Sequence, residues 1–168
     1  MIMTLERRLL SLLSLMLGAS LVLMGLRVEV ALRDRATARR FEALEGVAGA
    51  LNEAAGWQAI ERGTGTTILN ASTPAEALLT RFGQVGERGD EAAARAERHL
   101  EVLLTDFSTS ELEASVQRWR QSLATLRAAR AGVKRHGLES QAWVSLATQN
   151  IGREFDLRDV ALRPVGDH

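Results

Sequence analysis

The chain has 168 residues, of which 46% are hydrophobic and 25% charged, and its 21 basic and 21 acidic side chains cancel. A net charge of zero gives no electrostatic reason to bind a polyanion, and we expect no nucleic-acid partner. Cysteine is absent, which excludes disulfides, thiol chemistry and cysteine metal sites. Two prolines, no tyrosine and frequent Ala, Leu, Arg and Glu indicate an all-α protein with room for one domain beyond a membrane segment.

The first distinctive segment is Leu9–Leu26, which contains no charged residue. As a helix it would be about 27 Å long, close to the roughly 30 Å hydrocarbon core of a bilayer. Arg7 and Arg8 precede it and predict a cytoplasmic N-terminus by the positive-inside rule. We therefore expect a single-pass protein of the bacterial inner membrane, with its folded part in the periplasm. The corresponding divisions are a cytoplasmic N-terminus at 1–8, a transmembrane anchor at 9–26, a helical domain at 27–163 and a tail at 164–168.

A cleaved signal peptide is the alternative interpretation of the same segment. Its apolar region would normally span 7–15 residues and end in a small-x-small cleavage site. Here Gly18-Ala19-Ser20 is followed by further apolar residues, not by a polar mature start. The uncleaved anchor is the preferred prediction.

The anchor is predicted to continue without a break into a charged helix, giving a first helix of about Leu5–Arg62. The run Gly63–Thr67 combines two glycines with three β-branched residues, so we expect the helix to break or distort there. A 3-4 spacing of apolar residues predicts which face is buried. Its members are Phe41, Leu44, Ala48, Leu51 and Ala55.

A second helix is predicted to begin with Thr73 as N-cap, Pro74 at the first helical position and Glu76 closing a capping box. Gly83, Gly86 and Gly89 weaken it, and Asp90 could cap a helix that restarts after a kink near Gly89. The predicted apolar face consists of Leu78, Phe82, Val85, Ala92, Ala96, Leu100, Leu103 and Phe107.

The third helix has the clearest signals. Ser108–Glu111 is a capping sequence, and Gly137 is the expected C′ residue after a basic last turn. Its heptad face, typical of a coiled coil, consists of Leu112, Val116, Trp119, Leu123, Leu126 and Val133. A fourth helix, ending by Pro164, is predicted to turn Trp143, Leu146, Ile151 and Phe155 inward. Together the segments predict an N-terminal transmembrane helix continuing into an antiparallel up-down-up-down four-helix bundle.

The most distinctive short motif is Glu61-Arg62-Gly63. An arginine beside the free backbone amides of a glycine-rich turn is a reasonable site for a small anion, so Arg62, with Glu61 and Gly63, is the candidate ligand-binding group. In the structural alternative, which residue chemistry alone favours, Glu61 and Arg62 pair with neighbouring helices. His99, His136 and His168 lack a second ligand at helical spacing, and we expect no metal or cofactor.

The order of anchor, helix, Glu-Arg-Gly, Leu69, proline-started helix and Asp90 resembles the periplasmic four-helix sensor bundles of bacterial chemoreceptors, sensor histidine kinases and membrane diguanylate cyclases. It is also similar to nitrate- and nitrite-sensing bundles, which carry a Glu-Arg-Gly motif near this place. Arg127-Ala128-Ala129-Arg130 and Trp143 look like the later helices of such domains. The resemblance implies a ligand-sensing ectodomain that works as a homodimer, with Arg62 as the plausible ligand contact.

The leading function hypothesis is a membrane-anchored extracytoplasmic sensor in signal transduction, not an enzyme by itself. Because no second membrane helix and no HAMP, kinase, cyclase or methyl-accepting region follows, the resemblance implies either a receptor fragment without its output module or a small relative that lost it. The runner-up is an anchored adaptor or structural protein of the envelope. The sequence contains no phosphate loop, nucleophile elbow or paired-carboxylate motif that would favour an enzyme.

Overall fold

The computed structural model describes the backbone of residues 2–163 and the side chains of residues 16–18 and 20–163. This part of the chain is all-helical. The helices are α1 (Ile2–Asn70), α2 (Glu76–Phe107), α3 (Ser110–Lys134) and α4 (Ser140–Leu162). The predicted fold class is confirmed at this level.

Two compact units divide the chain, Met1–Phe41 and Glu42–His168. In the first unit, the apolar residues of the described part are exposed, as with Leu17 at 64% and Leu21 at 63%. No helix within the described residues is long and apolar enough to cross a membrane. The predicted span Leu9–Leu26 includes residues 9–15 and 19, whose side chains lie outside the described part, and it stays a prediction.

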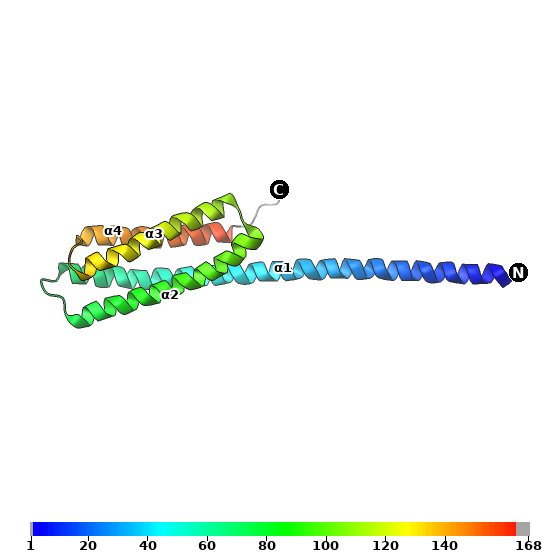
Figure 1. Ribbon diagram of the computed structural model, residues 1–168, viewed down its shortest axis with the longest axis horizontal. Coiled ribbons are helices and arrows are strands. Elements are labelled where there is room, and N and C mark those ends of the chain that lie inside the picture. Colours follow the sequence, from blue (N-terminus) through cyan, green and yellow to red (C-terminus); the bar gives the residue numbers. More distant parts are fainter. Residues whose placement is uncertain (1, 164–168) are drawn as a thin grey trace. The chain divides into compact units, whose positions relative to one another are not determined.

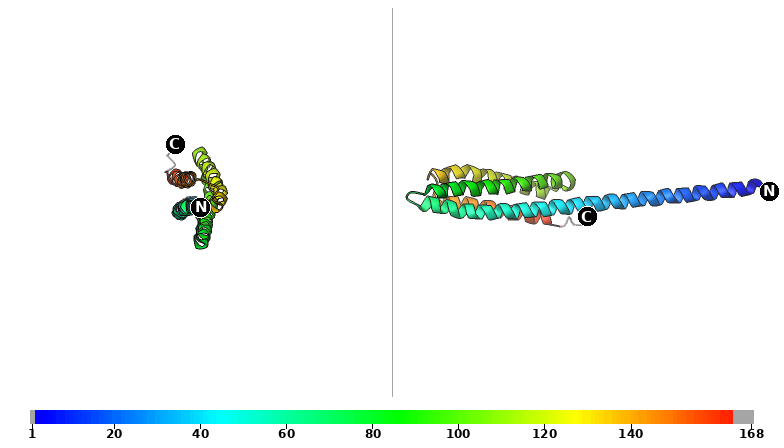
Figure 2. Two further views of the ribbon diagram at one scale, coloured as in Figure 1. Left: turned by 90° about the vertical axis from the view of Figure 1, so that its left-hand side faces the viewer. Right: turned by 90° about the horizontal axis from the view of Figure 1, so that it is seen from below.

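The second unit is a helical bundle with short connections. The C-terminal part of α1 and the helices α2, α3 and α4 lie side by side and alternate in direction, as Figures 1 and 2 show. Short links of this kind favour antiparallel neighbours because they are too short to cross the length of the bundle. The observed order is the up-down-up-down arrangement expected from the sequence.

The third helix follows its sequence signals closely. Thr109 is the N-cap, and its hydroxyl accepts a hydrogen bond from the Leu112 amide at 3.1 Å. All six predicted face residues are buried. At the C-terminus, however, the C′ residue is His136, with φ of 52°, and not Gly137. The Gly137 amide instead donates to the Gly132 carbonyl and the His136 amide to that of Val133, which is a Schellman arrangement.

The predicted break at Gly63–Thr67 is wrong, because α1 continues to Asn70. The hydroxyls of Thr64, Thr66 and Thr67 each donate to the carbonyl four residues earlier, at 2.7–3.0 Å. Ile68 beyond them is fully buried. Tertiary packing of this last part of α1 outweighs the low helix propensity of its residues.

The start of α2 also differs from the prediction. The N-cap is Ala75 and makes no side-chain cap hydrogen bond, so Thr73 and Pro74 lie in the loop and form no capping box with Glu76. The helix runs through Gly83, Gly86 and Gly89 without interruption. Six of the eight predicted face residues are buried, and Leu78 and Phe107 are half-buried.

The buried faces of α1 and α4 were predicted less well. Phe41 is 67% exposed, and the buried apolar face of α1 comprises Ala43, Val47, Ala50, Leu51, Ala54, Ala55 and Ile68. On α4, Phe155 is 40% exposed, and Leu146 and Ile151 are only half-buried. The observed face is Trp143, Ala147, Asn150, Glu154, Leu157 and Ala161.

The apolar core forms two clusters. One joins Val47, Leu51, Leu100, Trp119 and Leu157 with their neighbours. The other joins Ile68, Phe82, Leu126, Val133, Trp143 and Ala147, and in it the rings of Phe82 and Trp143 meet edge to face at 5.6 Å.

We expect Leu123→Ala to lower the free energy of unfolding by about 2–4 kcal/mol, because it removes buried apolar surface and leaves a cavity. Leu123 is 3% exposed and belongs to the first cluster. Urea unfolding followed by circular dichroism measures the change. Gln117→Ala, at an exposed position of the same helix, is the control and should change stability by less than about 0.5 kcal/mol. Equal effects would show that this face of α3 is not core.

Candidate functional site

A buried ion pair joins α1 to α3. Glu61 is 1% exposed, and its two carboxylate oxygens accept from Arg130 Nε at 2.6 Å and Arg130 Nη2 at 3.0 Å. This bidentate arrangement is the strongest geometry for an arginine–carboxylate contact. The predicted motif residue Glu61 is therefore bound within the fold, as in its structural alternative.

A second acid extends the pair to α2. Arg130 Nη1 donates to Asp90 Oδ2 at 2.6 Å, and the more exposed Arg127 donates to Asp90 Oδ1 at 2.9 Å. The predicted role of Asp90 as the cap of a restarted helix is wrong, since its side chain makes these ion pairs within a continuous α2. The four side chains form one network across three helices.

Gly86 on α2 allows the network to form. A Cβ added there would lie 3.2 Å from Arg130 Nε and 3.3 Å from Glu61 Oε1, tighter than most real contacts of a Cβ. Any larger residue would press on the two hydrogen-bonded groups. Helix propensity marks Gly86 only as a weak point of the helix, but its lack of a side chain leaves room for the ion pair.

Burial and charge act in opposite directions on this pair. Burial raises the pKa of Glu61, although the hydrogen bonds and charge of Arg130 lower it in part. Burial by itself would lower the pKa of Arg130, but its contacts with Glu61 and Asp90 outweigh that effect and raise it. The guanidinium therefore keeps its charge and has two carboxylates facing it.

A second polar group is buried between α1 and α4. Gln58 Nε2 donates to Glu154 Oε1 at 2.6 Å, and Asn150 Nδ2 donates to Gln58 Oε1 at 2.6 Å. These three side chains are at most 1% exposed. Gln58 and Glu61 lie three residues apart on α1, so the two polar groups are adjacent along the bundle.

Within residues 20–163 no ion pair involves Glu154, and its environment favours the neutral acid. Burial raises the pKa of Glu154 to about 8, against the smaller opposing effects of Gln58, Trp119 and Asn150. Among the described residues, Glu154 Oε2 and the indole nitrogen of Trp119 are both buried without a hydrogen-bond partner. Trp119 therefore lowers the pKa of this carboxyl without forming a hydrogen bond to it. A pKa of about 8 favours the protonated form at neutral pH.

The three residues of the Glu61-Arg62-Gly63 motif lie in different environments. Arg62 is half-buried and donates through Nη1 to Thr148 Oγ1 of α4 at 2.9 Å, while its carbonyl accepts from Trp143 Nε1 at 3.0 Å. Gly63 is exposed, and an added Cβ would meet nothing within 4 Å. Because residues 63–67 are helical, their amides do not form the expected anion-binding turn. Arg62 as a ligand contact stays a prediction.

The glycine that matters near the motif is Gly65. A Cβ at this position would lie 2.4 Å from Trp143 Nε1, so the indole packs directly on the α1 backbone. The sequence contains a partial signal for this contact, since Gly65 lies three residues before the apolar Ile68, and residues at i and i+3 share a face of a helix. The pairing with Trp143, far along the chain, carries no local signal.

A groove of about 470 Å³ opens beside the ion pair between α2 and α3. It is lined by Phe82, Gly83, Gly86, Glu87, Asp90, Glu91, Ala94, Arg130 and Lys134. Three carboxylates line the groove, and Arg130 is already paired there, so it offers no net positive charge to an anion. Among the described residues no group of His, Asp or Glu is arranged to hold a metal ion.

Comparison of the chain with protein-family models, with curated proteins and with solved structures finds no match.

Arg130→Met should lower the free energy of unfolding by about 3–5 kcal/mol, because it leaves Glu61 buried without its counter-charge. The matched control is Arg127→Met. Arg127 binds the same Asp90 but its side chain is 46% exposed, so its loss should cost less than about 1 kcal/mol. Chemical denaturation at neutral pH compares the two. Similar losses for both variants would contradict the assignment of the buried pair as the stabilising one.

The protein should lose stability as pH rises from about 4.5 to about 8, because the native state holds a proton on Glu154 that the unfolded chain releases near 4.5. The raised pKa of Glu61 acts in the same direction. Glu154→Gln keeps a neutral side chain, so it should reduce this fall and leave the variant more stable than the parent above pH 8. The midpoints of urea unfolding, measured for parent and variant between pH 4.5 and above pH 8, give the change in stability. Glu45→Gln, an exposed acid of α1, should leave the profile unchanged, and an unchanged profile in Glu154→Gln would refute the assignment.

Proposed function

We propose that the chain is a membrane-anchored extracytoplasmic sensor domain for signal transduction. The observation that carries the proposal is the continuity of α1, which includes Leu9–Leu26 and also supplies Gln58 and Glu61 to the buried polar groups of the bundle. One helix thus joins the proposed anchor to the part of the fold that would respond to a ligand.

The anchor rests on length, composition and exposure. Leu9–Leu26 carries no charge, and Arg7 and Arg8 precede it, which favours an N-terminus inside and a bundle in the periplasm. Within the described part, the N-terminal half of α1 carries a run of exposed large apolar side chains, including Leu21, Val22 and Leu23 at 61–64%. A contiguous exposed apolar surface favours lipid or protein contact.

The polar groups provide a route from ligand to anchor. Glu61 is held by Arg130 of α3, and Gln58 by Asn150 and Glu154 of α4. A ligand that shifts α3 or α4 would have to move α1 with them or break buried hydrogen bonds, each costing about 1–3 kcal/mol when a partner is left unsatisfied. Coupling of this size is enough for a ligand-driven change of state.

The anchor is tested with charges placed at two exposed leucines. Leu17→Arg with Leu21→Arg should release the protein from membranes, because each arginine costs about 2.5–3.5 kcal/mol near the centre of a membrane helix. Leu32→Arg is the matched control, since Leu32 is similarly exposed at 59% but lies outside Leu9–Leu26. Carbonate extraction shows whether each variant stays in the membrane, and mass spectrometry of the N-terminal peptide shows whether the parent is uncleaved.

A parent protein found only in the soluble fraction, or beginning near Leu21 after cleavage, would refute the anchor. A stop codon directly after His168, with a separate partner gene alongside, would favour the anchored adaptor instead of the receptor fragment. An in-frame membrane helix and output domain would favour the sensor.

We further propose that the sensor is a homodimer. Two copies held in one membrane plane have a high effective concentration, and Gly18 and Gly25, seven residues apart, would let anchor helices approach closely. On the bundle, Gly49, Gly56 and Gly63 repeat the same spacing along the exposed side of α1, with no atom within 4 Å of an added Cβ. That side of α1 is open to a second helix.

A cysteine introduced at Arg35, in a protein with no other cysteine, should form disulfide-linked dimers in membranes. Glu139→Cys, just before α4 at an exposed position, is the control and should stay monomeric. Non-reducing electrophoresis separates the two species. Absence of crosslinks at every position from Arg33 to Arg40 would indicate a monomer.

A further inference from the structure

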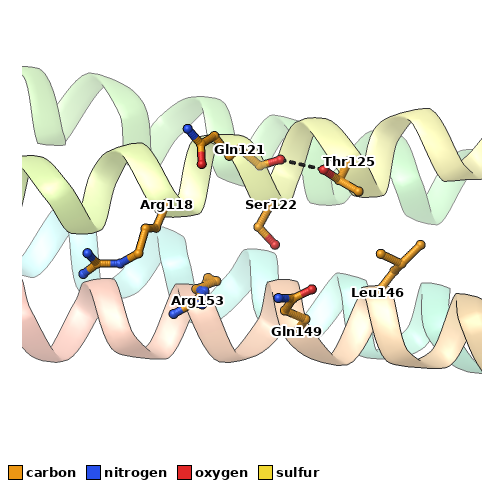
Figure 3. Close-up of a pocket in the computed structure, with 7 residues that line it drawn as sticks. All are labelled: Arg118, Gln121, Ser122, Thr125, Leu146, Gln149 and Arg153. Atoms are coloured by element: carbon orange, nitrogen blue, oxygen red, sulfur yellow. Dashed lines mark hydrogen bonds between the residues drawn. The ribbon is translucent and has the colours of Figure 1, made fainter.

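A polar groove of about 220 Å³ lies between α3 and α4, away from the buried ion pair. Figure 3 shows its residues, with Arg118 reaching from α3 toward α4 and Ser122 directed toward Gln149. The α3 side follows the helical repeat i, i+3, i+4, i+7, and the α4 side i, i+3, i+7. The lining residues are Arg118, Gln121, Ser122, Thr125, Leu146, Gln149 and Arg153.

The groove is positive and has no carboxylate in its lining. Arg118 is exposed and makes no ion pair or hydrogen bond within the described part of the chain. Within the described residues, Arg153 pairs only with Asp156, at 3.4 Å. The side chain of Asp156 is itself 62% exposed to solvent. Two arginines from adjacent helices thus share one groove with little compensating charge.

Two other arginines of α3, Arg120 and Arg130, are placed differently. Arg120, two residues from Arg118, binds both carboxylate oxygens of Glu97, with its shortest contact at 2.6 Å. Arg130 is bound by Glu61 and Asp90. The incomplete pairing of Arg118 and Arg153 therefore sets this groove apart from the ion pairs that hold the bundle together.

We propose that this groove binds a small divalent oxyanion, such as a short dicarboxylate or a phosphate. The two guanidinium groups would supply paired N–H donors, the arrangement best suited to carboxylate and phosphate oxygens. The Ser122 hydroxyl and the amides of Gln121 and Gln149 supply further donors. The hydroxyl of Thr125 already donates to the Gln121 carbonyl at 2.9 Å, so it contributes an acceptor only.

The size and composition of the groove limit the ligand. At about 220 Å³ it is smaller than the roughly 300–1,000 Å³ typical of sites for drug-sized molecules. Leu146 is the single apolar residue of the lining, enough to contact a short carbon chain. The binding inference deepens the sensor proposal and rests on it only for the ligand's signalling role.

The experiment uses the full chain purified in detergent, with succinate, inorganic phosphate or sulfate as probes and chloride at equal ionic strength as reference. At about 100 times its Kd, a bound probe should raise the melting temperature by roughly 5–10 °C. Phosphate and sulfate also stabilise proteins by exclusion from their surfaces. Each probe is therefore measured on variants as well, and isothermal titration calorimetry records binding directly.

Arg118→Ala and Arg153→Ala should each abolish the probe-specific rise and the calorimetric signal. Without probe, Arg118→Ala should melt at or slightly above the parent's temperature, because it removes repulsion between like charges. Arg118→Lys should restore only part of the affinity, since lysine lacks the planar fork. Arg98→Ala, at an exposed α2 arginine outside the groove, should behave as the parent.

Three results would overturn the proposal. One is a parent that responds to none of the three probes more than to chloride. Another is a response that survives both Arg118→Ala and Arg153→Ala. The third is a response lost in Arg62→Ala but kept in Arg118→Ala, which would place the anion at the Glu-Arg-Gly motif. None of these results bears on membrane attachment, so failure of the site and failure of the anchor are distinguishable.

Discussion

The bundle depends on a polar layer within its core, formed by the Glu61–Arg130 pair and by Gln58, Asn150 and Glu154. A charge buried as deeply as Glu61, at 1% exposure, is tolerated only when a counter-charge and hydrogen bonds replace water. That requirement fixes several other features. It places Asp90 of α2 against Arg130, and a side chain at position 86 would force the paired groups of Arg130 and Glu61 to shift.

We infer that this layer sets the rotation and register of α1. The inner face of that helix is rich in alanine, including Ala43, Ala50, Ala54 and Ala55, and small apolar side chains constrain helix sliding weakly. Hydrogen bonds are directional, so Glu61 and Gln58 meet their partners in one register only. The use of buried polar groups to specify one arrangement, at some loss of stability, is known from coiled coils.

How much of this could be predicted from the sequence differs between helices. On α3 every inward residue before Arg130 is apolar or small, so the heptad identified the face, and Thr109 capped the helix as expected. On α4 the true face has the same spacing, but Asn150 and Glu154 occupy two of its positions. Hydrophobic periodicity cannot recognise a buried polar residue, and it favoured Phe155, which is exposed.

The candidate site shows the same limit. The motif drew attention to Glu61, but its partner Arg130 lies 69 residues further along the chain, and no local pattern connects them. Glycines were similarly treated as helix breakers, whereas Gly65 and Gly86 are the positions where Trp143 and Arg130 approach the backbone. Propensity describes an isolated helix, and these glycines reflect what packs against it.

The two carboxyl groups of the layer, Glu61 and Glu154, are buried to a similar degree but are held in different states. Burial raises the pKa of Glu61, and the hydrogen bonds and charge of Arg130 oppose that rise. Glu154 faces amides and an indole, none of which carries charge, and burial raises its pKa to about 8. A protonated carboxyl needs an acceptor for its O–H, and among the described residues Asn150 Oδ1, a buried oxygen of the same group, also has no partner. The layer thus combines one ion pair with one neutral hydrogen-bonded group, and its net charge is set by proton binding at Glu154 rather than by residue composition alone.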